Sequence, residues 1–529
     1  AHFMPASLVD SQVALMEPLD AEEAARIYAH YQIKQAPQQA PQRSYQQARR
    51  VLDDAIEAHG GVEALRAIKD FTLKEKGKLI ARFQSPAAEQ FVTGTSEETL
   101  IVDMDRGFVF DDLKTNNNAG FNNWNRTVIK GADSFNYDMW SRTATPVVNP
   151  SVNNFRGQIR RLPLFVLLEA LDRASTLRYL GEEEFGGKKQ KVISVLRPDN
   201  QVLSLSFDAQ TNLLTRYGYL YADPIAGDSE IAQSYSGYRT LGKLKVPTGR
   251  VLYNSGGVVQ ETEYTDLQLN TKPADSVFQG PDNFEKLAAP PATPPPPAVS
   301  KIADDVYVLQ GLAGGTHNVL FVAFNDHVLV FEAPEQILYN SNSVQAMTKI
   351  KETVPGKPIK YLVLSHHHSD HAGGFREYVA EGATIVTTAE TKKSLEKAAT
   401  IESSLLPKIS QGKKLMIEAI EKKRVFQDDK HVVELYDIGP NPHADQIIVA
   451  YLPKEKILFQ ADLLNAAPNG TFPIAPDATV SFSENLQKLG LAVEKIYGVH
   501  GRFATPEELR TSIEKRRASE LKITGSGSH

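Results

Sequence analysis

The stretch "SHHHSDHAGG", residues 365–374, places four of the chain's 13 histidines within six positions, with an aspartate among them. It follows the apolar run "YLVL" and precedes a helical pattern, which predicts a loop from strand to helix. Alternate residues of an extended segment share a side, so His366 and His368 can face one point. Asp370 and His371, at the turn into the helix, can face a second. Imidazole and carboxylate are ligands for zinc and similar ions, which favours a metal site over a histidine-rich surface turn.

Three further residues that can bind metal follow at strand ends or in loops. His443 stands in "GPNPHADQIIVAYLP", Asp462 ends the run "KILFQAD", and His500 ends the short run "IYGVH". The first 300 residues hold only three histidines, so the imidazoles gather in the second half of the chain. We therefore expect the chemistry of the protein to lie in that half.

Proline marks the clearest domain boundary. The segment "LAAPPATPPPPAVS", residues 287–300, predicts an extended linker, since repeated proline cannot join a packed sheet or helix. Before it, two helices separated by Gly60 and Gly61 lead into period-two runs typical of an antiparallel sheet. After it, strands interspersed with helices indicate a layered α/β domain. The expected division is a helical extension over 1–42, a β-rich accessory domain over 43–286, the linker, a catalytic domain over 301–524, and an artificial tail, "GSGSH", over 525–529.

Composition limits the classes of partner and compartment. The net charge is −6, which argues against a nucleic-acid-binding surface, and no apolar run approaches the roughly 18 residues of a membrane helix. The chain has no cysteine, so disulfides and thiolate ligands are excluded. This fits an oxidising compartment. We expect a periplasmic or secreted protein whose signal peptide has been removed, with a cytoplasmic location as the alternative.

Together the stretches "SHHHSDHAGG", "NPHADQIIVAYLPKEKILFQAD" and "YGVHGR" resemble the metallo-β-lactamase superfamily. The resemblance implies an αββα sandwich over the C-terminal domain and two divalent ions, with Zn²⁺ expected and Fe or Mn as alternatives. By matching position, it assigns His366, His368 and His443 to one metal, and Asp370, His371 and His500 to the other, with Asp462 bridging. His367 is not a ligand by that pattern, and we expect structural roles for His317 and His431.

One position departs from the family pattern. Members commonly carry an aspartate after the early apolar strand, whereas the stretch "VLVFEAPE" has Glu332 there. Glutamate can still accept an imidazole N–H, so Glu332 is a candidate for supporting a ligand, with an ordinary strand-end carboxylate as the alternative. The β-rich half loosely resembles periplasmic lipoprotein-carrier-like domains, with a curved antiparallel sheet and N-terminal helices. We therefore expect this half of the chain to be a scaffold, and it could mediate homo-oligomerisation.

The implied activity is hydrolysis of a small-molecule ester, lactone, thioester or phosphoester by a hydroxide that bridges two metals. Asp370 would orient this nucleophile and accept its proton. The aspartate at 462, where the best-known zinc β-lactamases have cysteine, makes β-lactam hydrolysis an alternative or side activity. A carrier of apolar ligands with a secondary metal domain and a mono-iron oxidoreductase are the competing hypotheses. The lysine-rich segment 390–424, helical in pattern, is either a lid or a pair of solvated surface helices.

Overall fold

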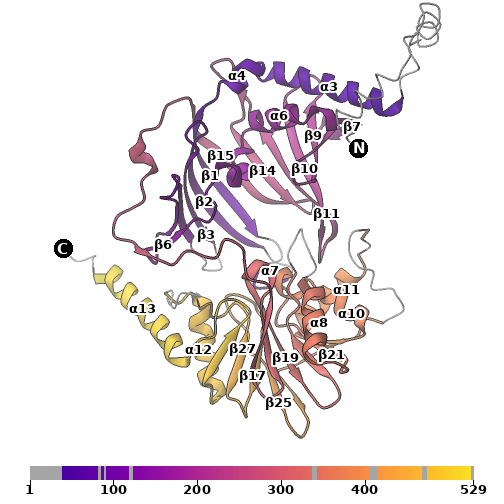
Figure 1. Ribbon diagram of the computed structural model, residues 1–529, viewed down its shortest axis with the longest axis vertical. Helices are drawn as coiled ribbons and strands as arrows, with labels where there is room; N and C mark the ends of the chain where they lie inside the picture. Colours follow the sequence, from indigo (N-terminus) through magenta and orange to yellow (C-terminus); the bar gives the residue numbers. More distant parts are fainter. Residues whose placement is uncertain are drawn as a thin grey trace, which may run out of the picture.

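The computed structural model describes residues 39–81, 85–88, 91–117, 123–335, 342–401, 403–404, 414–466 and 474–525. It contains a β-rich N-terminal domain and a layered C-terminal domain, one above the other in Figure 1. The helical extension expected over residues 1–42 lies outside the described residues as far as residue 38, and helix α3, the first of the expected pair, begins at Ala40. Among the described residues, no helix is long and apolar enough to cross a membrane.

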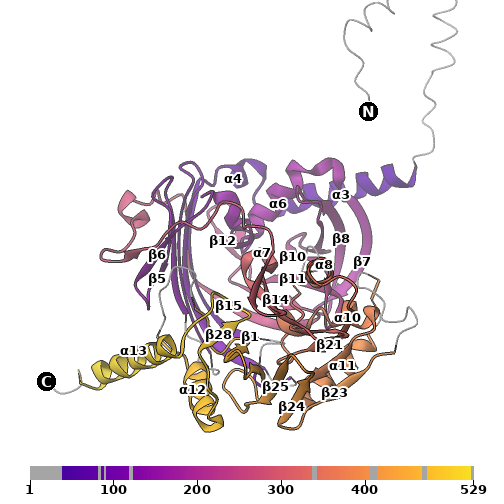
Figure 2. The same cartoon turned by 60° about the horizontal axis from the view of Figure 1, so that its bottom comes forward.

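The N-terminal domain is built on one curved sheet of 14 strands (Figures 1 and 2). The strand order is β16-β6-β5-β4-β3-β2-β1-β15-β14-β11-β10-β9-β8-β7, and all pairs are antiparallel except β16 with β6. The bounds are β1 Asp70–Ala81, β2 Val92–Asp103, β3 Phe108–Asn117, β4 Asn123–Ile129, β5 Phe135–Asp138, β6 Thr143–Pro146, β7 Arg178–Phe185, β8 Lys188–Leu196, β9 Val202–Asp208, β10 Leu214–Asp223, β11 Gly227–Ser236, β14 Gly249–Asn254, β15 Gly257–Leu269 and β16 Glu285–Lys286. A separate short hairpin pairs β12 Arg239–Leu241 with β13 Leu244–Val246.

Helices pack on this sheet through a single large apolar core. They are α3 Ala40–Ala58, α4 Val62–Arg66, α5 Arg156–Ile159 and α6 Pro163–Asp172. Leu52 of α3 and Leu167 of α6 are fully buried beside Phe71 of β1. The break between α3 and α4 lies at Gly60 and Gly61. Their φ values of 120° and 87° would be strained in any residue that carries a side chain. The predicted pair of helices and the meandering sheet are therefore confirmed.

Two further sheets form the C-terminal domain. The first has the order β17-β18-β19-β20-β21-β22-β23 and the second β24-β25-β26-β27-β28. The first comprises β17 Ala298–Ala303, β18 Val306–Gly311, β19 His317–Ala323, β20 Val328–Phe331, β21 Ile359–Val363, β22 Thr384–Thr387 and β23 Ile417–Ala419; the second comprises β24 Lys423–Gln427, β25 Val432–Asp437, β26 Ile448–Leu452, β27 Ile457–Gln460 and β28 Lys495–Gly498. The helices are α7 Leu312–Gly315, α8 Asn342–Thr353, α9 Ser369–Ala372, α10 Phe375–Glu381, α11 Ala389–Ala399, α12 Asp477–Leu489 and α13 Pro506–Gly525.

Apolar side chains connect these layers. Leu320 of β19 and Phe459 of β27 belong to one core shared by the two sheets. Phe321, the neighbour of Leu320, points to the opposite side of its sheet and joins a core with α8 and α10. On the second sheet, Leu458 packs in a core with Phe482 of α12. Burial on both faces explains the continuous apolar runs "VLFVA" in β19 and "IVAYL" in β26.

Two expected boundaries in this domain differ from the structure. The pattern of "SENLQKLGLAVEKI", residues 483–496, predicts a helix, but α12 ends at Leu489 because Gly490 has a left-handed φ of 63°. Ile496, at the end of that stretch, lies in β28 because its side chain is buried in the sheet core. Within the described residues of the lysine-rich segment, α11 is a helix, whereas Ile417–Ala419 and Lys423–Gln427 are strands. Its residues 405–413 lie outside the described part of the chain.

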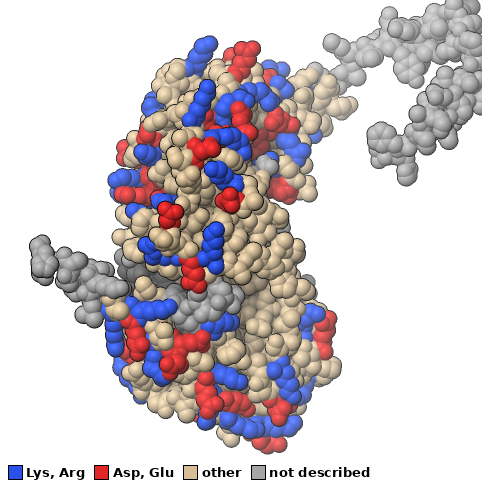
Figure 3. Space-filling view, turned by 60° about the vertical axis from the view of Figure 1, so that its left-hand side comes forward, with Lys and Arg blue, Asp and Glu red and all other residues tan. Residues whose placement is uncertain are grey.

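Charged side chains on the face shown in Figure 3 mix lysine and arginine with aspartate and glutamate across both domains. The linker runs from the sheet of the N-terminal domain to β17, which begins at Ala298 and so takes up the last three linker residues. The remaining linker residues form an extended and largely exposed segment, because repeated proline prevents regular structure.

Candidate metal centre

The candidate ligands lie where strands of both sheets end. The "SHHHSDHAGG" stretch follows β21 and contains the short helix α9. Asp462 comes two residues after β27, and His500 two residues after β28. His443 lies in the loop between β25 and β26. A backbone bond from Ile448 to the carbonyl of Ser365, 2.9 Å long, ties the two sheets at this edge.

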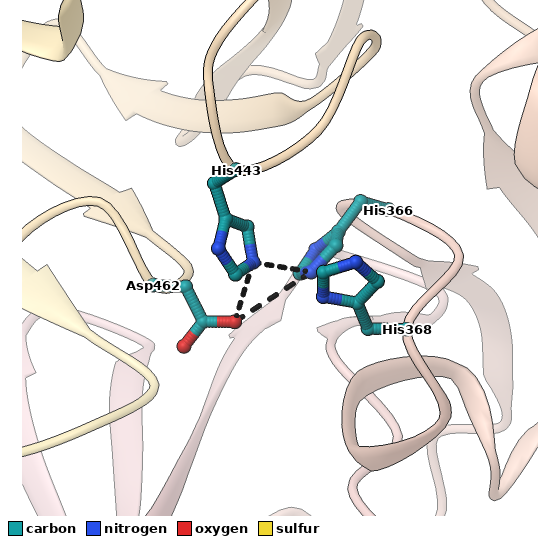
Figure 4. Close-up of side chains that lie close together, drawn as sticks. All are labelled: His366, His368, His443 and Asp462. Carbon is teal, nitrogen blue, oxygen red and sulfur yellow. Dashed lines mark hydrogen bonds and ion pairs between the residues drawn. The ribbon is translucent and has the colours of Figure 1, made fainter. Parts of the chain in front are cut away.

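The seven predicted ligands gather in two groups that share Asp462. His366, His368, His443 and Asp462 form the first, drawn in Figure 4. The second consists of Asp370, His371, Asp462 and His500. Within each group the ligand atoms lie within 4.8 Å of one another. The division between two points that the sequence predicted is therefore the division of the structure.

Asp462 lies at the centre of both groups. Its Oδ2 is 2.7 Å from Nε2 of His371 and 3.0 Å from Nε2 of His443. Its Oδ1 is 2.9 Å from Nε2 of His500. The side chain comes from a backbone with a φ of 34°, a left-handed conformation that is strained for aspartate and typical of functional sites.

Hydrogen bonds fix the outward-facing nitrogens of several imidazoles. Nδ1 of His366 is 2.8 Å from Ser365 Oγ, and Nδ1 of His500 is 2.8 Å from the carbonyl oxygen of Thr316. Nε2 of His368 is 3.0 Å from the carbonyl oxygen of Ser85, which belongs to the N-terminal domain. Such bonds hold each ring so that its other nitrogen faces the group.

Glu332 performs the same task for His371. Its Oε2 lies 2.9 Å from Nδ1 of His371, and its Oε1 accepts from the N–H of Ser365 at 2.9 Å. The side chain is fully buried and its backbone has a φ of 83°. The candidate that the sequence singled out at the end of β20 thus contacts a predicted ligand directly.

Burial and neighbouring charges set the protonation of the groups. Burial, reinforced by the surrounding histidines, holds the pKa of His366 and His368 well below the usual value of 6.5. Burial also lowers the pKa of His371, but the nearby Asp462 and Asp370 outweigh it and raise that pKa well above 6.5. For Asp462, burial raises the pKa, but His371, His443 and His500 together lower it well below 3.8. Before a metal binds, the site therefore holds neutral imidazoles at His366 and His368, a protonated imidazole at His371 and an ionised carboxylate at Asp462.

These residues fit divalent metal ions. The donors are five imidazoles and two carboxylates, the nitrogen and oxygen ligands that zinc and related ions prefer. Nδ1 of His368 is buried and has no hydrogen-bond partner within the described residues. A buried nitrogen of this kind is costly unless a ligand meets it, and a metal ion would do so.

The remaining histidines lie apart from the two groups or beside them. His367 is buried, with 6% of its surface exposed, and is in neither group. His431 lies away from both, beside Phe324. His317, which the sequence assigned a structural role, lies beside the second group, with its ring 4.4 Å from that of His500 and its Nε2 3.9 Å from Oδ2 of Asp370. Asn318, the residue after it in β19, donates to the carbonyl of Val499 after β28, and this bond brings His317 beside His500.

Comparison with known proteins identifies the class of this domain. The family model described as the metallo-beta-lactamase superfamily matches residues 342–500. This part of the chain belongs to that superfamily, and membership indicates a metal-dependent hydrolase. No curated protein matches the chain.

Solved structures of similar shape include three metallo-beta-lactamases. The one from Pontibacter korlensis is 21% identical, with a TM-score of 0.33, over 42% of this chain and 99% of that chain. The one from Hirschia baltica is 18% identical, with a TM-score of 0.32, over 41% of this chain and 96% of that chain. FIM-1 from Pseudomonas aeruginosa, in a mono-zinc form, is 18% identical, with a TM-score of 0.31, over 43% of this chain and 97% of that chain.

Proposed function

We propose that the protein is a dinuclear metal hydrolase, built on a four-layer αββα sandwich, that cleaves a small-molecule ester, lactone, thioester or phosphoester. The observation that carries this proposal is the pair of ligand groups joined at Asp462. A single carboxylate shared between two sets of imidazoles is the arrangement that a two-metal hydrolytic site needs. Zn²⁺ is the expected ion, with Fe or Mn as alternatives.

In this proposal His366, His368 and His443 would hold the first ion, Asp370, His371 and His500 would hold the second, and Asp462 would serve both. Divalent ions bound there supply Lewis acidity, because they lower the pKa of water from about 15.7 toward about 7 and polarise a carbonyl or phosphoryl oxygen. Glu332 and the other outer partners keep the imidazoles oriented, so the chain meets the substrate with its ligands already in position.

Asp370 is the proposed general base. Its side chain is 34% exposed, whereas those of His366, His368 and His371 are fully buried. It is thus the ligand most open to an incoming water and substrate. As the water oxygen forms its bond to the acyl carbon or phosphorus, Asp370 accepts the proton, and the leaving atom departs when its bond to that centre breaks.

The aspartate at 462 supports the choice of substrate class over β-lactams. By the family resemblance, a carboxylate at this position belongs to thioesterases, lactonases and phosphodiesterases, and a cysteine to the best-known zinc β-lactamases. We further propose a periplasmic or secreted location, from the cysteine-free composition.

The test is a metal assay coupled to a hydrolysis panel. The protein, loaded in turn with Zn²⁺, Mn²⁺ and Fe²⁺, is offered lactones, p-nitrophenyl esters, thioesters, phosphotriesters, phosphodiesters and a chromogenic cephalosporin. We expect about two ions per chain and turnover of at least one ester-type substrate, lost in His368→Ala. Full activity of that variant on every substrate would overturn the site assignment. Turnover of the cephalosporin alone would overturn the substrate class.

A further inference from the structure

The tip between β1 and β2, residues 85–88 of the N-terminal domain, reaches the metal centre of the C-terminal domain. Ser85 is fully buried there, and its carbonyl oxygen lies 3.0 Å from Nε2 of His368. The carbonyl of Pro86 accepts a 2.8 Å bond from the N–H of Asp445, two residues after His443. These contacts join segments that are far apart in the chain and belong to different domains.

A third bond holds the tip at its other end. The N–H of Ala88 donates to Oε1 of Glu390, at the start of α11, over 2.6 Å. Glu390 is itself held, because its N–H donates to Oε1 of Gln446 at 2.9 Å. Within the tip, the hydroxyl of Ser85 donates to the carbonyl of Ala87 at 2.6 Å, which stiffens the turn. The tip is therefore docked through defined polar contacts along its length.

The bond to Ser85 determines which nitrogen of His368 can bind metal. A carbonyl oxygen only accepts, so Nε2 carries the proton. A neutral imidazole then has its lone pair at Nδ1, and in this structure Nδ1 of His368 is buried and lacks a hydrogen-bond partner among the described residues. His368 offers one ligand atom to the group formed with His366, His443 and Asp462. That atom is Nδ1.

We propose that the N-terminal domain completes the metal centre, with the carbonyl of Ser85 as the positioning group that sets the tautomer and rotation of His368. This inference rests on the proposed function, since it concerns the same metal site. His366, His371 and His500 are anchored within the C-terminal domain, by Ser365, Glu332 and Thr316. For His368 the anchor comes from the other domain, so binding of the first metal depends on where the docked tip places the carbonyl of Ser85.

A second turn of the N-terminal domain supports the same docking. Pro224, between β10 and β11, packs so closely on Gly373 that a Cβ placed there would lie 2.9 Å from the Cβ of Pro224. Asp228, just beyond, accepts bonds from the N–H and hydroxyl of Ser404, at 3.0 and 2.6 Å. This second contact does not touch a ligand nitrogen, so it provides a matched control.

The test compares metal affinity in full-length variants. In the first, residues 85–88 are replaced by two glycines, which shortens the tip so that its backbone carbonyl is withdrawn from Nε2 of His368. Glu390→Ala loosens the tip without shortening it, and decides the question if the first variant does not fold. Ser85→Ala keeps the carbonyl. Asp228→Ala weakens the docking elsewhere. Metal-free protein is titrated with Zn²⁺ against a chromophoric chelator, and His443→Ala identifies the binding step of the first group.

We expect the glycine replacement to weaken the first step about 10- to 100-fold, the range for loss of a partner that orients a ligand, and to leave the second step unchanged. Glu390→Ala weakens the same step less, and Ser85→Ala and Asp228→Ala bind as the parent does. Unchanged affinity in the folded glycine variant, or an equal loss in Asp228→Ala, overturns the inference. A parent protein that binds no metal overturns the proposed function instead, so the two failures are distinct.

Discussion

Glu332 is the residue whose replacement tests most directly how the second metal group is held. Its two carboxylate oxygens accept from two buried partners, the N–H of Ser365 and the ring of His371. In Glu332→Gln the side chain keeps its length, but only one terminal atom can accept. The amide NH₂ must therefore face either a backbone N–H or an imidazole N–H. We expect the variant to fold and to bind the second metal more weakly.

The size of the effect follows from the bond that is lost. A hydrogen bond to a charged group contributes about 1.5–3 kcal/mol, and the abandoned donor is fully buried. At about 1.4 kcal/mol per tenfold change, this corresponds to about a 10- to 100-fold loss of affinity for the second ion. The first group does not contact Glu332 directly, so the affinity for the first ion should change little.

The assay is a Zn²⁺ titration of the metal-free variant, with turnover of the best substrate measured at saturating metal. Glu332→Asp serves as the matched control, since it keeps the charge and shortens the side chain by one methylene. We expect it to bind more tightly than Glu332→Gln. If Glu332→Gln binds both ions as the parent does, Glu332 does not orient a ligand, and His371 must be held by its remaining contacts.

Three further outcomes follow from the same structure. Removal of metal by a chelator should lower the free energy of unfolding of the C-terminal domain, by about 2.7 kcal/mol for each site when free Zn²⁺ had been at 100 times its Kd; an unchanged denaturant midpoint would contradict this. Arg250→Ala should destabilise the N-terminal domain by about 1.5–3 kcal/mol in urea, because it removes a hydrogen bond between buried charged side chains while Arg161 still pairs with Glu75. Lys76→Ala, in an exposed pair, should change the stability by less than about 1 kcal/mol. Burial lowers the pKa of His59 to about 4 in the folded state, so the unfolded chain binds a proton more readily. The free energy of unfolding should therefore be fully present above about pH 6.5 and fall by about 3 kcal/mol as the pH drops to about 4. His59→Leu should lack that part of the pH dependence.

Much of the candidate site could be predicted because metal sites need side chains of a few types at the ends of rigid elements. The strand before His366 and the runs before Asp462 and His500 are strongly apolar, so their ends could be placed from the sequence. Glu332 was a candidate for the same reason, at the end of β20. His317 was not, because its closeness to His500 depends on contacts between two sheets, and no local pattern encodes those.

The glycines after the motif illustrate a different limit. A pair of glycines such as Gly373 and Gly374 is typical of a tight turn, but their φ values are −60° and −82°, which any residue can adopt. They are needed for space instead, since a Cβ at Gly374 would lie 1.8 Å from Oγ of Ser343. The sequence indicates that glycine is required directly after the motif. The physical reason becomes visible only once the neighbouring elements are in position.

The contact at Ser85 lies beyond sequence reasoning altogether, because the group that acts is a backbone carbonyl, which every residue has. Its role comes from where the β1–β2 tip ends, and that is fixed by the length of two paired strands and by the docking bonds to Asp445 and Glu390. The β-rich half was expected to be a scaffold, with a loose resemblance to lipoprotein carriers that stays a prediction. A purely structural domain would not need to bury a strand tip beside His368. The contact gives the N-terminal domain a chemical part in the site, since the tautomer of one ligand in the first metal group depends on it.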